Sequence, residues 1–439
     1  MFIRQTFAYY AFVLVLLSCN GVSQDSNVPQ RQSVTEVNAK EIAVGKSTIA
    51  ITGATVIDGN GGPPLSNGCV LIRGNIIEAV GIIDAVTIPK DAERVDASGL
   101  TLMPGLMDAH FHLDRIKGLP ALFLQHGVTS VRDPGAWIEA YENERKPGKA
   151  APRLFLCGPH LDMPPPAYPY DAYIVRDSIE AVYAVNKQIQ EGAAAIKVYF
   201  RMPPDLIRIV CNTAREKGIP VTAHLEITEA MEAIEAGLDG VEHITSFGLT
   251  LIPRREAEKY RQSVLSGNDF RKHGRYELWA KIDMQGNKVD SLAKFLMKKG
   301  TFVTPTLGPF EYRPEKNDHD TAKLSGFTNM KVLTARLQKL GVRMVLGSHS
   351  MIPYAEEGWA YQREMELWVE SGVDPSDVIV ASTMQNARYF RVDDRLGSIE
   401  KGKIADLILI KGNPLQDIST MRNIEKVMLN GVWVHPGRK

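Results

Sequence analysis

The fold is decided by one stretch of this 439-residue chain, Leu102-Met103-Pro104-Gly105-Leu106-Met107-Asp108-Ala109-His110-Phe111-His112-Leu113. An apolar run with strand character, residues 102–107, leads into two histidines that are one residue apart. Successive side chains of a strand point to opposite faces, so His110 and His112 are expected on the same side. Two imidazoles placed in this way can share one metal ion.

Further strand-like runs follow, and three of them carry one basic side chain each. These three are residues 194–199 with Lys197, 219–224 with His224, and 238–243 with His243. The other runs are residues 128–132, 154–157, 302–306 and 342–347, and helix-like segments are expected near 115–125, 178–191, 204–217 and 228–236.

Eight strand units that alternate with helices predict an α/β protein with a parallel (β/α)8 barrel of the TIM type. Such barrels carry their chemistry at the C-terminal ends of the strands. The five basic side chains all lie at these ends, so we expect them to meet in one site. Four imidazoles and a lysine suit a divalent transition metal, and zinc fits best because the chain has no thiolate cluster.

The chain resembles the amidohydrolase superfamily, in the branch that holds imidazolonepropionase-like enzymes and metal-dependent dipeptidases. The resemblance covers residues 48–434 and rests on the ordered ligand set and on three blocks, residues 104–110, 127–135 and 396–407. It implies that the short strands at both chain ends form one composite β-sandwich, residues 47–101 and 391–439. The barrel, residues 102–390, would be inserted between them.

The resemblance also implies a role for each ligand. His110 and His112 would bind the more buried of one or two ions, and His224 and His243 would bind the outer one. Lys197 would bridge the ions after carboxylation by carbon dioxide. Ions that share a water lower its pKa and polarise a carbonyl, which suits hydrolysis of a C–N bond in an amide, cyclic amide or dipeptide-like molecule.

One position departs from the family pattern. The aspartate expected after strand eight, which takes the proton from the attacking water, is replaced by His349. An imidazole can be a general base, so His349 is the predicted catalytic residue. Two alternatives stay open from the sequence: a lyase or decarboxylase, and a catalytically silent metal-binding lipoprotein.

Substrate contacts are expected from residues close to the lysine strand and from the loop after strand three. Tyr199, Arg201 and His160 are the predicted substrate-binding residues, and Arg201 could hold a carboxylate through two hydrogen bonds. Residues 253–285 form a long, charged insertion after strand six. It reads as a loop, and either a lid or a solvated excursion fits it.

The N-terminus predicts export. Residues 7–17 form an apolar run that is too short to span a membrane, and Leu16-Leu17-Ser18-Cys19 resembles a bacterial lipobox. We therefore expect a lipoprotein-type signal peptide at 1–19, lipidation of Cys19 and a flexible tether at 20–46. The enzyme would then be anchored to a membrane through this lipid alone, on the periplasmic or cell-surface side.

Composition limits the partners. The formal net charge is zero, so nothing favours nucleic-acid binding. The remaining partners are a small-molecule substrate and other copies of the chain in a homo-oligomer. The cysteines after Cys19 are scattered singly and predict neither disulfides nor a thiolate metal site.

Overall fold

The computed structural model describes residues 34–434 except 115 and 318. The predicted signal peptide 1–19, its Cys19 and residues 20–33 of the predicted tether lie outside the described residues, and they stay predictions. Among the helices of the described part, none combines the length and apolar character needed to cross a membrane.

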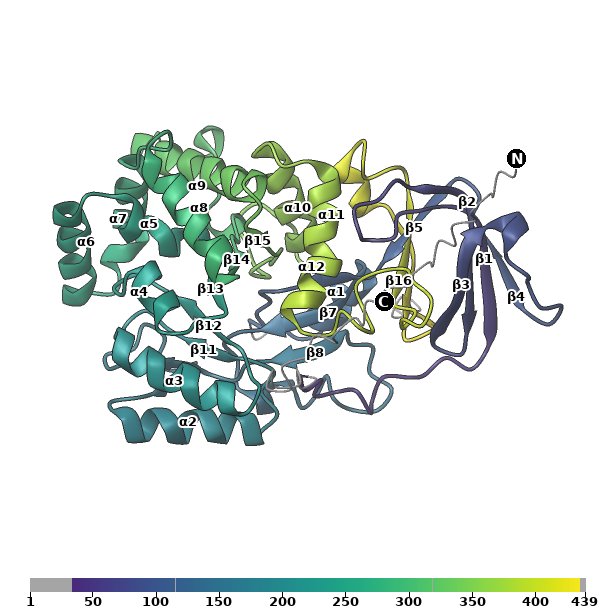
Figure 1. The fold of residues 1–439 in the computed structure, drawn as a ribbon, viewed down its shortest axis with the longest axis horizontal. Coiled ribbons are helices and arrows are strands. Elements are labelled where there is room, and N and C mark those ends of the chain that lie inside the picture. The colour runs from purple at the N-terminus through teal and green to yellow at the C-terminus, as the bar shows by residue number, and fades with distance from the viewer. Residues whose placement is uncertain (1–33, 115, 318, 435–439) are drawn as a thin grey trace, which may run out of the picture. The chain divides into compact units, whose positions relative to one another are not determined.

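Strands from both chain ends form the predicted small β unit. They hydrogen-bond into one eight-stranded sheet, in which β5 pairs antiparallel with β16 (Figure 1). Apolar side chains of this sheet gather into a core cluster of their own. The strands are β1 (Thr48–Val56), β2 (Leu65–Arg73), β3 (Ile76–Ile82), β4 (Glu93–Asp96), β5 (Leu100–Pro104), β16 (Leu407–Lys411), β17 (Ile424–Leu429) and β18 (Val432–Val434).

The stretch that decides the fold contains two strands rather than the single run expected at 102–107. β5 ends at Pro104 in the end sheet, and β6 (Leu106–Asp108) begins the barrel. Gly105 makes the crossing because a Cβ there would lie 2.2 Å from Thr129 Oγ1. A strand of one sheet therefore passes directly into the other at a residue without a side chain.

The barrel uses eight parallel strands, in the predicted order. Ladders join β6 to β8 and β11 to β15, and backbone hydrogen bonds cross the two seams between them, among them those from Ala194 to Leu156 (2.7 Å) and from Ala109 to Leu346 (3.0 Å). The strands are β6, β7 (Val128–Asp133), β8 (Arg153–Leu156), β11 (Ile196–Val198), β12 (Val221–His224), β13 (Gly240–Glu242), β14 (Phe302–Thr304) and β15 (Arg343–Met344). Two extra strands, β9 (His160–Asp162) and β10 (Ala172–Ile174), extend the sheet beside β11.

Helices follow the strands of the barrel and pack apolar residues into its core (Figure 1). They are α1 (Leu119–Gln125), α2 (Ser178–Gln190), α3 (Pro204–Glu216), α4 (Ala230–Glu235), α5 (Gly248–Leu251), α6 (Arg254–Ser266), α7 (Phe270–Ala280), α8 (Asn287–Lys299), α9 (Thr321–Lys339), α10 (Ala360–Glu370), α11 (Pro375–Ser382) and α12 (Met384–Tyr389). The connections also contain 3-10 turns: η1 (Ile83–Ala85), η2 (Ile138–Tyr141), η3 (Ile244–Phe247), η4 (Gly308–Phe310), η5 (Pro314–Lys316) and η6 (Ile418–Arg422).

The insertion at 253–285 is not the loop that we expected. It folds into α6 and α7, which pack against each other, and α7 also packs against α9. A segment with many charged residues is usually exposed to solvent, but Arg271 and Arg275 of α7 are buried. Helical spacing places both on one side of α7, and this side faces the barrel mouth.

Residues 34–46, which we expected to be the end of a flexible tether, pack against the protein. Val34 is buried, and the Glu36 carboxylate forms a 2.9 Å ion pair with Arg153 at the start of β8. Arg153 also pairs with Asp406, just before β16. Because these charges are buried together, the segment is held in place, and only residues 20–33 remain for the predicted tether.

Candidate metal centre

Six basic side chains meet at the C-terminal ends of the barrel strands. His110 and His112 follow β6, Lys197 lies in β11, His224 ends β12, and His243 and His349 follow β13 and β15. The ring centroids of His110 and His243 lie 4.6 Å apart, and those of His224 and His243 lie 4.4 Å apart. The structure thus brings together the five predicted metal ligands and His349, from five different strands.

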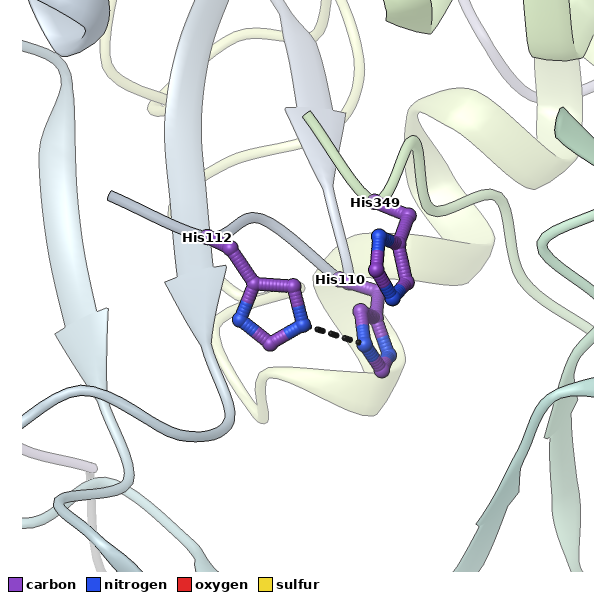
Figure 2. A group of neighbouring side chains, drawn as sticks. All are labelled: His110, His112 and His349. Carbon is purple, nitrogen blue, oxygen red and sulfur yellow. Dashed lines mark hydrogen bonds between the residues drawn. The ribbon is translucent and has the colours of Figure 1, made fainter. Parts of the chain in front are cut away.

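His110, His112 and His349 form the first half of this cluster, which we call the inner group (Figure 2). One ring nitrogen from each lies within 4.8 Å of the others. The Nε2 atoms of His110 and His112 are 3.0 Å apart and face each other. Three imidazole nitrogens at these separations match the ligand set of a divalent metal ion.

Buried carboxylates orient the two rings that come from the first strand. Glu242 Oε2 lies 2.7 Å from His110 Nδ1, and Asp133 Oδ1 lies 3.6 Å from His112 Nδ1. A ring that donates from Nδ1 keeps the lone pair of Nε2 for an ion. Sequence reasoning missed both acids, although Glu242 stands directly before His243 and Asp133 ends β7.

Glu242 is held in turn by three strands. It accepts hydrogen bonds from Arg132 and from the Thr222 hydroxyl (2.7 Å), and it is fully buried. Burial raises the pKa of Glu242, but Lys197 and then Arg132 outweigh burial, so the pKa is lowered and the group stays ionised. An ionised, fixed acceptor keeps the proton of His110 on Nδ1.

Hydrogen bonds around Asp108 join the ends of β6 and β15, the first and eighth strands of the barrel. Asp108 Oδ1 accepts the N–H groups of His110 (3.0 Å) and Ser348 (2.9 Å). The His349 N–H donates to the His110 carbonyl (2.7 Å), and His349 has a φ of 62°. This left-handed backbone is uncommon for a residue with a side chain and brings the His349 ring to the inner group.

Lys197, His224 and His243 form the outer group. His243 Nδ1 lies 2.5 Å from the Thr306 hydroxyl, but Lys197 Nζ and His224 Nδ1 are buried without a hydrogen-bond partner among the described residues. Burial lowers the pKa of Lys197 to about 8 and that of His224 to about 3. His224 is therefore neutral, and Lys197 has a sizeable unprotonated fraction near neutral pH.

The cluster fits a divalent ion for reasons that lie in its own atoms. A buried amine and a buried ring nitrogen without partners are unfavourable unless another group binds them. Burial also lowers the pKa of His110 and His349 well below the ordinary value, so both rings are neutral and present lone pairs. Neutral nitrogen donors around a buried centre suit zinc or a similar metal.

Two of the three predicted substrate contacts lie beside the outer group. The Tyr199 ring stands between those of His160 and His224, with centroid distances of 4.2 and 4.8 Å. Arg201 does not face them, because its Nη2 is bonded to the Val264 carbonyl and to Asn268, near the α6–α7 connection.

The arginines near the site come from α7, and sequence reasoning missed them. Arg275 pairs with Glu226, whose Oε1 lies 3.3 Å from His224 Nε2, and Arg271 donates to the Tyr168 hydroxyl at 2.7 Å. Burial raises the pKa of Glu226, but Arg275, together with His224, outweighs burial and lowers it to about 2. The only available signal was the spacing of four residues within a segment that read as a loop.

Comparison with known proteins agrees with this architecture. The model of the amidohydrolase family matches residues 101–434. Ochratoxinase of Aspergillus niger is 24% identical over 462 residues, covering 88% of this chain and 85% of the relative. A solved structure from Bifidobacterium longum, provisionally assigned as a prolidase, has a TM-score of 0.70 at 23% identity and covers 90% of this chain and 96% of its own. A Xaa-Pro dipeptidase with bound methionine gives 0.67 at 22% identity, with 89% and 100% covered.

Proposed function

The chain belongs to the amidohydrolase family and is a hydrolase of carbon–nitrogen bonds, and we propose that the inner and outer groups form its reaction centre. The observation that carries this proposal is the set of buried nitrogens without partners, Lys197 Nζ, His224 Nδ1 and His349 Nδ1, beside the facing Nε2 atoms of His110 and His112. The alternative of a catalytically silent binding protein is not favoured, because the relatives of this chain are hydrolases and all five predicted metal ligands are present in the site.

The proposed ligands are the five predicted ones. His110 and His112 would hold the inner ion, and His224 and His243 the outer ion, with zinc as the expected metal. Lys197 would join them as a carbamate, formed when its unprotonated Nζ adds to the carbon of carbon dioxide and releases a proton. When bound, the ions lower the pKa of a shared water and polarise the carbonyl of the substrate.

His349 takes the place of the family's aspartate as the proposed proton acceptor. Its ring lies 4.7 Å from that of His112 and 5.3 Å from that of His110, and its low pKa leaves it unprotonated and able to accept. A carboxylate can bind an ion through one oxygen and accept a proton with the other. The two nitrogens of an imidazole point away from each other, so His349 cannot do both toward the same water.

This difference predicts the behaviour of two variants. We expect His349→Asp to raise turnover and His349→Ala to lower it about 100-fold, the usual contribution of general acid–base catalysis. Turnover and bound metal should be measured together on each variant. An unchanged turnover in both variants, with metal retained, would show that His349 is not the proton acceptor.

The proposed substrates are small amides, cyclic amides and dipeptide-like molecules. The dipeptidase and ochratoxinase relatives support this range. The test is an activity screen of N-acyl amino acids and dipeptides, with and without added zinc and bicarbonate. Hydrolysis that depends on both additions supports the metal centre and the carbamate, and a flat response across the whole screen contradicts the proposal.

A further inference from the structure

Arg271 and Arg275 are two buried cations close to the outer group, and we call them the arginine pair. They lie four residues apart on α7, so both project from one side of the helix. Only 5% of Arg271 and 8% of Arg275 is exposed. Arginines are rarely buried to this extent unless anions compensate their charge.

The charge of the pair is only partly compensated. Arg275 forms an ion pair with Glu226, which also accepts from the Tyr260 hydroxyl. Among the described residues, Arg271 donates to the neutral Tyr168 hydroxyl at 2.7 Å and lies over the Tyr168 and Phe200 rings, at 5.2 and 5.5 Å. Within the described part of the chain, Glu226 pairs with Arg275, and no carboxylate forms an ion pair with Arg271.

Each arginine also has a donor that remains unused. Arg271 Nε and Arg275 Nε are both buried without a hydrogen-bond partner among residues 34–434 as described. A buried donor left unsatisfied is destabilising, and more so when it is charged. The pair therefore has both the charge and the donors to bind one further anion.

Aromatic rings connect the arginine pair to the outer histidines, through two rings from Arg271 and through one ring from Arg275. From Arg271, the Tyr168 ring leads to Tyr199 (6.0 Å between centroids), which contacts His224. From Arg275, the Phe310 ring, 4.9 Å from its guanidinium carbon, lies 5.8 Å from the His243 ring. An anion held here would be part of the molecule whose amide lies over the metal ligands.

We propose that the arginine pair binds the carboxylate of the substrate, so that the enzyme acts on N-acyl amino acids or dipeptides and discriminates against neutral amides. This inference rests on the proposed function for the bond that is cleaved. A carboxylate fits because guanidinium groups bind its two oxygens through parallel hydrogen bonds. Arg201, which we expected to do this, bonds through its Nη2 to Asn268 and to the Val264 carbonyl near the α6–α7 connection, and its Nε is without a partner among the described residues.

The test compares an acid with its uncharged counterpart, N-acetyl-phenylalanine and N-acetyl-phenylalaninamide. Wild-type holoenzyme should have a higher kcat/KM for the acid. Arg271→Met should lower kcat/KM for the acid about 10- to 100-fold, mainly through KM, because a hydrogen bond to a charged group contributes this much. It should lower kcat/KM for the amide much less, because the amide has no carboxylate for Arg271 to bind.

Lys272→Met is the matched control. Lys272 is the next residue on α7, is exposed, and contacts Asp269, so this variant removes the same charge away from the site. We expect it to keep the preference for the acid. Arg271→Lys should fall between wild type and Arg271→Met, because it keeps the charge and loses the paired donors.

Calorimetric binding of the same two compounds separates the inference from the proposed function. If neither compound is cleaved but wild type binds the acid more tightly and Arg271→Met does not, the anion site stands and the hydrolytic proposal fails for these compounds. If wild type cleaves or binds both equally, or Arg271→Met weakens both equally, the arginine pair does not bind the carboxylate.

Discussion

The inner and outer groups of the metal centre are built differently. The inner group takes two of its rings from one strand end, and Glu242 and Asp133 face their Nδ1 atoms. The outer group takes each member from a separate strand, and Lys197 Nζ and His224 Nδ1 have no partner in the described part of the chain. The two inner rings that follow β6 are therefore oriented in advance by their own partners, whereas Lys197 and His224 would be satisfied by the proposed carbamate and ion.

This difference predicts the order in which the two groups bind their metal ions. A preorganised ligand set binds more tightly because less order is lost on binding. The outer group would bind its ion only after Lys197 has changed from a cation into an anion, since an ammonium repels a metal ion. We therefore expect the inner ion to bind first, without bicarbonate, and the outer ion to bind with it.

The largest effects on metal content and turnover are expected when ligands are removed from the inner group and from the outer group separately. We expect His110→Ala/His112→Ala to lose both ions and to lower turnover about 1000-fold or more, because a metal supplies several kcal/mol of catalysis. His224→Ala should keep one ion and lose the other. Metal content per chain and turnover, measured at increasing bicarbonate, check both expectations. A double variant that still binds one ion per chain would show that the inner group does not fill first.

Substituting the hydrogen-bond partners of the rings should have a smaller effect, which is a change in metal affinity. Glu242→Gln weakens the fixed acceptor of His110, and we expect metal affinity to fall about 10- to 100-fold, as is usual for groups that hold a ligand in place. Thr306→Val removes the hydroxyl beside His243 and should have the weaker effect, because that partner is neutral. Competition with a chelator measures both affinities.

Glu242 also pairs with Arg132, so loss of an ion pair must be separated from loss of the ring's partner. Arg132→Met leaves the Glu242 carboxylate beside His110 and removes the pairing cation. If Arg132→Met weakens metal binding as much as Glu242→Gln does, the effect belongs to the ion pair and the two groups do not differ in the proposed way.

The parts of this centre that could be predicted are those with a local signal. The two histidines after β6 lie two residues apart, Lys197 stands in the middle of a strand-like run, and His224 and His243 each end one. Since parallel strands bring these ends to one rim, strand order alone predicts that they meet. The predicted (β/α)8 architecture is correct for the same reason.

The parts that could not be predicted depend on contacts between distant segments. Residues 102–107 read as one strand because only the nearby Thr129 side chain shows that Gly105 must lack a Cβ. The segment of α7 read as a charged loop, either a lid or a solvated excursion, because the partner of Arg275, Glu226, lies 49 residues earlier. Burial of a charged residue follows from its partner, which no local period reveals.

The smallest effect is expected in the loop that supports the outer group. Glu364 of α10 is fully buried and accepts the N–H groups of Leu307 (2.8 Å) and Gly308 (2.7 Å), directly after Thr306. Burial raises its pKa from about 4.5 to about 7, although these donors oppose the shift. Between these two pH values the folded protein keeps a proton that the unfolded chain has lost. The stability that Glu364 contributes is thus complete below pH 4.5 and is lost as the pH rises through 7, by roughly 3 kcal/mol.

Glu364→Gln should remove this dependence, because an amide does not titrate and still offers an acceptor. We expect the fall in the free energy of unfolding between pH 5 and pH 8, measured by urea denaturation, to be smaller in this variant than in wild type. Glu366→Gln is the control on the same helix: burial raises the pKa of Glu366, but Arg422 outweighs burial and lowers it, so that group is already ionised at pH 5. An equal fall in the free energy of unfolding of wild type and Glu364→Gln would mean that Glu364, which supports the outer group, does not titrate in this range. The inner and outer groups would then differ only in their metal ligands.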